Sequence, residues 1–193
     1  MSKRIALLTA AAFGALALTT AVVAPVNAQD KMTKSELSGE KTVMVGGAAM
    51  FPSKNIIQNA VNSKDHTTLV AAVKAAGLVD TLEGKGPFTV FAPTNAAFAK
   101  LPAGTVDTLV KPENKATLTK ILTYHVVAGK LEASNLTDGK KLKTVQGEEL
   151  TVKRSGDTVM IIDSKGDSST VTIPNVNQSN GVIHVVDTVL MPS

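Results

Sequence analysis

The sequence contains no cysteine, no tryptophan and a single tyrosine, and only 3% of its 193 residues are aromatic. The absence of cysteine excludes disulfide scaffolds, thiolate zinc sites, iron–sulfur clusters and thiol-based catalysts. The chain nevertheless has 44% hydrophobic residues, which is enough for a buried core and excludes disorder throughout. Its length suits one domain, with little left for a second.

A basic start and a long apolar run open the chain. The apolar stretch 5–24 is followed by Pro25 and by small residues up to Ala28. This pattern is typical of a cleavable export signal, whereas an uncleaved membrane anchor would not need the proline or the small residues. We therefore expect a signal peptide over 1–28, cleavage between Ala28 and Gln29, no stable membrane anchor after cleavage, and a secreted or periplasmic location.

The basic excess of the chain is small once this segment is set aside. The formal net charge is +4, and the signal contains two basic residues and no acidic ones. The remaining basic residues cluster only at Lys140, Lys141 and Lys143, without the interleaved aromatics of a nucleic-acid interface. We interpret these lysines as a solvated loop and expect no nucleic acid as a partner.

Two segments follow the expected cleavage site. Residues 29–50 are polar and then rich in glycine and alanine, without a sustained hydrophobic period. That composition predicts a flexible leader. Residues 51–193 are predicted to form the folded domain.

The two halves of this domain differ in hydrophobic pattern. Apolar residues at helical spacing predict helices over 55–61 and 68–76 and after Thr94 and Pro112, with a buried strand over 88–92 between them. Later, short β-branched runs separated by turn residues predict strands over 142–145, 149–153, 158–162, 170–176 and 182–190. Helices that precede strands indicate an α+β fold.

Three motifs make the sequence recognisable. Residues 89–98 (TVFAPTNAAF) resemble the first signature of the fasciclin (FAS1) family, and residues 181–192 (GVIHVVDTVLMP) resemble its second. Tyr124 and His125 lie where that family has a Tyr-His pair. The resemblance covers about 53–192 and is closest to the secreted single-domain bacterial members, such as the mycobacterial antigens of the MPB70 type.

The resemblance implies a wedge of two β-sheets flanked by short helices, with the helices mainly in the N-terminal half. It also implies a role in adhesion or matrix binding, without enzymatic activity or cofactor. The motif residues expected to be structural are Thr89, Phe91, Pro93, Thr94, Asn95, Phe98, Gly181, His184 and Asp187.

The Tyr-His pair has two interpretations. The resemblance associates it with adhesion, which implies a recognition strip of Leu122, Tyr124, His125 and Val126. Alternatively, His125 is a buried histidine that bonds to the backbone or to a carboxylate, because an imidazole among apolar residues must be hydrogen-bonded. We favour the second interpretation.

The other two histidines suggest no catalytic or metal site. We expect His66 to cap a helix or to be exposed, and His184 to face water if its strand is half-buried. The three histidines are far apart in sequence and show no i, i+4 pairing, so no metal site is expected. The chain also has no G-x-S-x-G elbow and no glycine-rich phosphate loop, so no catalytic residues are expected.

These observations predict an exported, monomeric, non-enzymatic binding module for cell adhesion or surface interaction. Its partner is expected to be a cell-surface or matrix protein or saccharide. The alternative is a carrier or receptor for a small apolar or saccharide ligand held in a groove. A pocket of roughly several hundred Å³ would favour the carrier, whereas a solid domain with an exposed apolar strip would favour adhesion.

Overall fold

The computed structural model describes residues 41–193. The expected signal peptide over 1–28, including the Ala28–Gln29 bond, lies outside these residues.

The first described element is a β-hairpin. Strands β1 (Val43–Val45) and β2 (Ala48–Met50) pair antiparallel. The glycines at 46 and 47 form the turn with φ values of 57° and 76°, which glycine adopts without steric cost. Val45 and Met50 are buried in the hydrophobic core. The expectation of a flexible leader up to residue 50 is therefore corrected: residues 43–50 belong to the fold, and their short strands lack a periodic signal.

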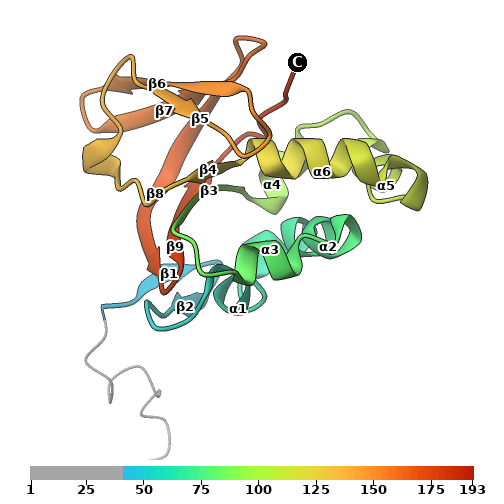
Figure 1. Cartoon of the computed structure of the whole chain (residues 1–193), viewed down its shortest axis with the longest axis horizontal. Coiled ribbons are helices and arrows are strands. Elements are labelled where there is room, and N and C mark those ends of the chain that lie inside the picture. The colour runs from blue at the N-terminus through green and yellow to red at the C-terminus, as the bar shows by residue number, and fades with distance from the viewer. Residues whose placement is uncertain (1–40) are drawn as a thin grey trace, which may run out of the picture. The chain divides into compact units, whose positions relative to one another are not determined.

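Helices are concentrated in the N-terminal half, as the order of the patterns predicts (Figure 1). Helix α2 ends at Gly77, whose left-handed conformation (φ 72°) closes the last turn. The single-turn helices α3 and α5 have no counterpart in the prediction. The helices are α1 (Ile56–Ala60), α2 (Thr67–Ala76), α3 (Val79–Glu83), α4 (Asn95–Ala99), α5 (Thr105–Leu109) and α6 (Lys115–Tyr124), with 3-10 turns at Lys64–His66, Pro112–Asn114 and Ala133–Asn135.

The remaining strands form one seven-stranded sheet in the order β4-β3-β9-β8-β7-β6-β5. Strands β3 and β9 are parallel neighbours, and the other neighbours are antiparallel. The strands predicted over 149–153 and 158–162 form an antiparallel hairpin of β6 and β7. The strands are β3 (Phe88–Pro93), β4 (Val126–Ala128), β5 (Lys141–Lys143), β6 (Glu149–Ser155), β7 (Thr158–Ile162), β8 (Ser168–Gln178) and β9 (Gly181–Val186).

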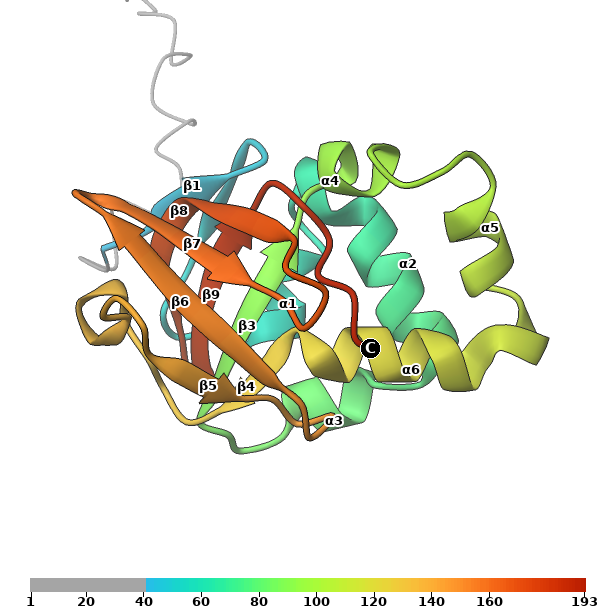
Figure 2. The ribbon, with the colours of Figure 1, turned by 90° about the horizontal axis from the view of Figure 1, so that it is seen from above.

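The seven-stranded sheet curves until its two edges nearly meet (Figure 2). A single antiparallel bridge between Val127 and Thr144 joins the edges. Beside it, the N–H of Val145 donates to the carbonyl of Val126 over 2.7 Å. Strand β8 contains register shifts, and Asn175 within it has a positive φ of 57°. Such bulges bend a strand, so β8 can pair with β7 at one end and with β9 along the rest.

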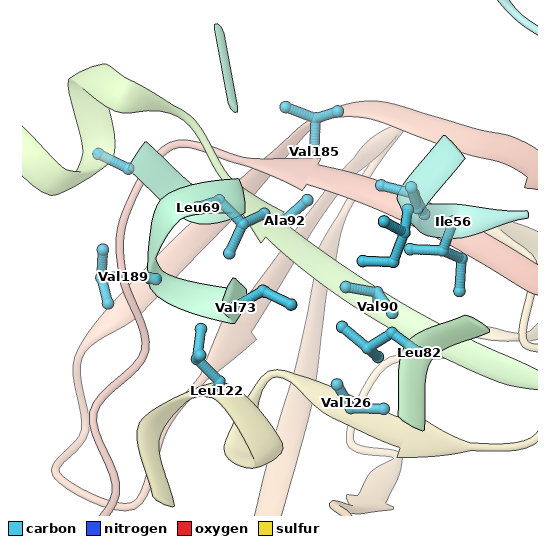
Figure 3. Packing of buried hydrophobic residues seen from close by; sticks show 14 of the residues in the cluster. Ile56, Leu69, Val73, Leu82, Val90, Ala92, Leu122, Val126, Val185 and Val189 are labelled. Carbon is cyan, nitrogen blue, oxygen red and sulfur yellow. The ribbon is translucent and has the colours of Figure 1, made fainter. Parts of the chain in front are cut away.

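The curved sheet separates two hydrophobic clusters. One lies inside the curve and contains Phe91 and Tyr124. The other lies between the sheet and helices α1, α2, α3 and α6, and Figure 3 shows Leu69 of α2 next to Ala92 of β3 and Val73 of α2 on the same side as Val90. Strand β9 is buried along its whole length because it is a central strand covered on both faces.

Candidate functional site

The Tyr-His pair lies at the junction between α6 and β4. Helix α6 directs Leu118, Ile121 and Leu122 into the core. Tyr124 is its last residue, and His125 follows as the C-cap. Both side chains are buried, with exposed fractions of 0% and 1%.

Both ring nitrogens of His125 are hydrogen-bonded to the backbone. Nε2 accepts from the N–H of Leu190 over 3.0 Å, so Nδ1 carries the proton and donates to the carbonyl of Ile121 over 2.9 Å. Burial disfavours the charged ring and lowers the pKa of His125 from 6.5 to about 4. His125 is therefore a neutral residue that connects α6 to the segment after β9.

These positions correct the expectation of a recognition strip. Leu122 and Val126 are also buried, at 5% and 6% exposure, so none of the four expected strip residues presents its side chain to a partner. The structure places His125 in the buried, backbone-bonded role of the favoured interpretation.

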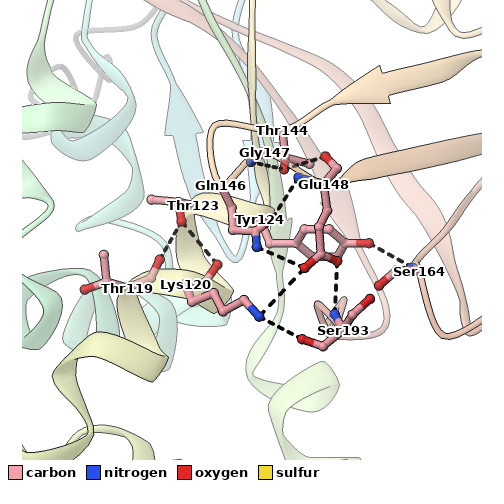
Figure 4. Close-up of polar contacts among 10 residues, drawn as sticks. All are labelled: Thr119, Lys120, Thr123, Tyr124, Thr144, Gln146, Gly147, Glu148, Ser164 and Ser193. Carbon is pink, nitrogen blue, oxygen red and sulfur yellow. Dashed lines mark hydrogen bonds and ion pairs between the residues drawn. The ribbon is translucent and has the colours of Figure 1, made fainter.

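A polar network surrounds the hydroxyl of Tyr124 (Figure 4). This hydroxyl accepts a hydrogen bond from the N–H of Ser164 over 2.8 Å, and burial raises the pKa of Tyr124. Nearby, Glu148 accepts from the N–H of Ser193 over 3.0 Å. That hydrogen bond is the main reason why the pKa of Glu148 is lowered to about 2. Lys120 pairs with Glu148 at 3.7 Å, so the network ties α6 to the last residue.

His184 does not face water. It is fully buried in β9, where its ring stacks on Phe91 with centroids 5.7 Å apart. Nδ1 accepts from the N–H of Asn175 over 3.3 Å, and Nε2 donates to the carbonyl of Leu131 over 2.7 Å. An exposed His184 is expected only for a half-buried strand, and this condition is not met because β9 is central in the sheet and buried along its whole length.

The first signature forms the corner between β3 and α4. Thr94 caps α4 by accepting from the N–H of Ala97 over 3.2 Å, as a threonine before a helix predicts. The side chain of Asn95 does not cap α4. Its Oδ1 accepts instead from the N–H of Thr68 over 3.0 Å, and Asn95 therefore joins α4 to the start of α2.

The other residues of the first signature that were expected to be structural are buried. Thr89 donates to the carbonyl of Gly129 over 2.6 Å and fixes the loop after β4. Phe91 and Phe98 fill the two different hydrophobic clusters, and Pro93 ends β3.

The second signature is structural too. A Cβ atom at Gly181 would collide with the backbone of Phe88, so only glycine permits this close approach of β9 to β3. Asp187 accepts from the N–H of Thr170 over 2.8 Å and pairs with Lys100 at 3.6 Å.

Asn180 is a buried connection that sequence reasoning missed. Its Oδ1 accepts from the N–H of Ile56 over 3.1 Å, and its Nδ2 donates to the carbonyls of Leu82 and Gly84 over 2.7 and 2.9 Å. The sequence shows only an Asn-Gly turn at this point, because its partners are 96 to 124 residues away.

Within residues 41–193, no group of three or more His, Asp or Glu residues could hold a metal ion. In the same range, no helix is long and apolar enough to cross a membrane.

His66 also differs from expectation. It is 3% exposed, and its Nδ1 lies 2.9 Å from Oγ of Ser63. Its Nε2 is buried and has no hydrogen-bond partner of normal geometry. Burial lowers the pKa of His66, and the nearby Ala92 carbonyl partly counteracts this shift. A buried polar atom without a partner costs about 1–3 kcal/mol.

His66 contributes to an apolar cavity between the helices and the sheet. The cavity has a volume of about 70 Å³, and its lining includes Val45 and Met50 of the hairpin, Leu82 of α3 and Val90 of β3. Natural interiors contain few voids larger than a water molecule. At about 24 cal/mol per Å³, an empty cavity of this size costs about 2 kcal/mol.

A second, open groove lies where the edges of the sheet meet. It has a volume of about 430 Å³ and lies between β4 and β5. Lys140, Lys141 and Lys143 line it together with apolar residues such as Val127 and Leu131. We call it the seam groove. It forms because only one bridge joins the two edge strands, and its lysines are the cluster that the sequence suggested to be a solvated loop.

The seam groove continues onto the outward face of the sheet. Lys141 pairs with Thr151, and Thr151 pairs with Ile162. In β5, β6 and β7 the buried residues alternate with exposed or half-buried ones, so these three side chains lie side by side on the solvent-facing side.

Comparison with known proteins agrees with this architecture. The family model of the fasciclin domain matches residues 64–192. Protein sll1483 of the Synechocystis strain PCC 6803 is 49% identical over 153 residues, covering 79% of this chain and 82% of that protein. Immunogenic protein MPB70 of Mycobacterium bovis is 36% identical over 199 residues, covering 100% of this chain and 98% of that protein.

The fold has a solved counterpart as well. A FAS1 domain pair from the insect cell adhesion molecule Fasciclin I superimposes with a TM-score of 0.65 at 19% sequence identity. The match covers 73% of this chain and 52% of the insect chain, so this chain spans about half the length of that pair. The chain has the FAS1 fold and belongs to the fasciclin domain family.

Proposed function

We propose that this chain is an exported, non-enzymatic binding module for surface or matrix interactions, and that it binds an acidic polysaccharide in the seam groove. The observation that carries the proposal is the grouping of Lys140, Lys141 and Lys143 beside apolar side chains in an open groove. Export is supported by the signal pattern over 1–28.

The charges in the groove favour an anionic partner. The ammonium of Lys143 makes no hydrogen bond or ion pair within residues 41–193. Lys141 shares its charge with Glu149 at 3.4 Å, and Lys140 donates to the carbonyl of Asn135 over 2.8 Å. Carboxylates spaced along a polymer would complement Lys141 and Lys143.

The adjoining sheet face supports a long partner. Thr151 and Ile162 continue the row that begins at Lys141, and none of the α-helices within residues 41–193 covers this side of the sheet (Figure 2). A sugar chain in the seam groove could therefore extend over hydroxyl and apolar side chains. The buried Tyr-His pair offers no such surface.

The test uses the chain from residue 29 onward and alginate, a linear polymer of uronic acids, with neutral dextran as the comparison. Lys141→Gln combined with Lys143→Gln should weaken alginate binding roughly three- to tenfold and reduce its salt dependence. The matched control, Lys74→Gln with Lys111→Gln, removes the same charge from two exposed positions, one on α2 and one directly before the 3-10 turn at Pro112–Asn114, and should have little effect. Equal binding to dextran, or an equal loss in the control, would contradict the proposal.

A further inference from the structure

The apolar cavity between the helices and β3 is enclosed by side chains from several elements. Its walls include Val45 and Met50 of the hairpin, Val73 of α2, Leu82 of α3 and Val90 of β3. These five side chains belong to one buried hydrophobic cluster, and Figure 3 shows Leu82 next to Val90. The cavity is therefore a gap within the core of the domain.

The polar residues of the lining direct their hydrogen-bonding groups elsewhere. Both ring nitrogens of His125 bond to the backbone, and the hydroxyl of Thr123 bonds to carbonyls of its own helix. Nδ1 of His66 lies against Oγ of Ser63, and the same ring interacts with the backbone of Ala92. A buried water needs two to four polar partners, so this lining disfavours water and suits an apolar molecule.

The volume of the cavity limits the size of such a molecule. An engineered cavity of about 150 Å³ binds benzene, which corresponds to about 25 Å³ for each carbon atom. The cavity of this protein has a volume of about 70 Å³, and by that measure it accommodates up to about three carbon atoms.

The cavity approaches the surface next to α3. Thr81 and Val145 belong to the lining, and both are exposed. Helix α3 has five residues, of which only Leu82 is buried. A small displacement of Leu82 would therefore connect the cavity with solvent and let a small molecule enter.

We propose that this cavity is a binding site for apolar molecules of up to about three carbon atoms, the size class of the small hydrocarbon gases. Such a molecule needs no hydrogen-bond partner, and its atoms supply contacts that the lining residues otherwise lack. A polar or charged molecule is excluded because it would lose its hydration without compensation. The site is separate from the seam groove and does not depend on the proposed surface binding.

The experiment dissolves cyclopropane, a hydrocarbon gas of matching size, in a solution of the ¹³C-labelled chain from residue 29 onward. The methyl NMR signals of Val73, Leu82 and Val90 should shift in a saturable way. Those of Val152 and Val159, which lie in the cluster inside the curved sheet, should not. Benzene should leave all of these methyl signals in place, because it is too large for the cavity.

An enlarged cavity should accept the larger probe. Leu82→Ala removes three carbon atoms and adds about 75 Å³, which brings the cavity to roughly the size that binds benzene. This variant should therefore bind benzene, and a folded Leu82→Ala that does not would contradict the assigned lining. If the variant fails to fold, the comparison of cyclopropane with benzene in the wild type decides without it.

A filled cavity should lose its affinity for the gas. Val73→Ile combined with Val90→Ile adds two carbon atoms, which occupy about 50 Å³, and should weaken cyclopropane binding about tenfold or more. Val152→Ile combined with Val159→Ile is the matched control. It adds the same volume to the other cluster and should leave cyclopropane binding unchanged.

Three results would overturn the proposal: no saturable shift with cyclopropane in the wild type, equal binding of benzene by the wild type, or unchanged cyclopropane affinity in Val73→Ile with Val90→Ile. None of them bears on alginate binding, so failure here is distinguishable from failure of the proposed function.

Discussion

Nε2 of His125 accepts a hydrogen bond from the backbone N–H of Leu190 over 3.0 Å, across 65 residues of chain. Together with the bond from Nδ1 to the Ile121 carbonyl, this contact joins the end of α6 to the segment that follows β9. The Tyr-His motif of this chain is thus a connection inside the domain.

Removing this ring should destabilise the domain. His125→Ala leaves the N–H of Leu190 and the carbonyl of Ile121 without partners and creates a void, so the free energy of unfolding should fall by about 3 kcal/mol. Thr123→Ala is the control, because Thr123 is half-buried and its side chain bonds only within its own helix. Urea unfolding measures both. An unchanged stability of His125→Ala together with lost surface binding would contradict the structural role.

Stability should depend on pH in the range where buried histidines titrate. The pKa of His125 is about 4 in the folded protein and about 6.5 in the unfolded chain. Below pH 6.5 the unfolded chain therefore binds a proton that the folded protein does not. The free energy of unfolding should have its full value above about pH 6.5 and should fall by about 3 kcal/mol as the pH approaches 4.

Urea unfolding between pH 7.5 and 4.5 tests this dependence. Burial also lowers the pKa of His66 and His184, which should steepen the loss. Glu148 contributes outside this window, since its stabilisation is lost only as the pH falls from about 4.5 through about 2. His125→Ala should show a shallower dependence than the wild type, and a flat profile in the wild type would disprove the assignment.

A methyl group at position 181 should disrupt the centre of the sheet. In Gly181→Ala, the new Cβ meets the backbone of Phe88, so β3 and β9 must move apart, and we expect a loss above about 2 kcal/mol. Gly139→Ala is the control: its φ of 74° strains alanine, but nothing lies within 4 Å, and a loss of about 1 kcal/mol is expected. Thermal melting compares the two. Equal losses would mean that the contact with Phe88 does not limit this position.

Phe91 should be a major contributor to stability. Its side chain is fully buried inside the curved sheet and stacks on His184. Phe91→Ala should lower the free energy of unfolding by about 3–5 kcal/mol. Phe51→Ala, at a half-buried position, should cost clearly less in the same chemical unfolding assay. If Phe91→Ala and Phe51→Ala lowered the free energy of unfolding by similar amounts, Phe91 would not be a core residue.

The sequence predicts those features that local chemistry determines. The buried strand around Phe91, the cap formed by Thr94 and the hairpin through Gly156 each depend on residues within a few positions of one another. The order of helices and strands then predicts the α+β class. Three motifs in sequence order were sufficient to indicate the family.

Features that depend on distant partners could not be predicted. Asn180 bonds to Leu82 and Ile56, which are 98 and 124 residues away. The burial of His184 depends on the central place of β9 in the sheet, and the seam groove depends on how two edge strands diverge. The three lysines are visible in the sequence, but their grouping with Leu131 in one groove is a property of the fold alone.

The most direct test of the account is to map the surface that contacts an acidic sugar. Short uronic acid oligomers titrated into the ¹⁵N-labelled chain from residue 29 onward should shift the amide signals of Lys141, Lys143 and Ala128 beside the seam groove. The amides around Tyr124 and those of α5 should stay in place. Saturable shifts centred on Tyr124 or on α5, with the seam groove unaffected, would contradict the claim that this chain binds through the groove.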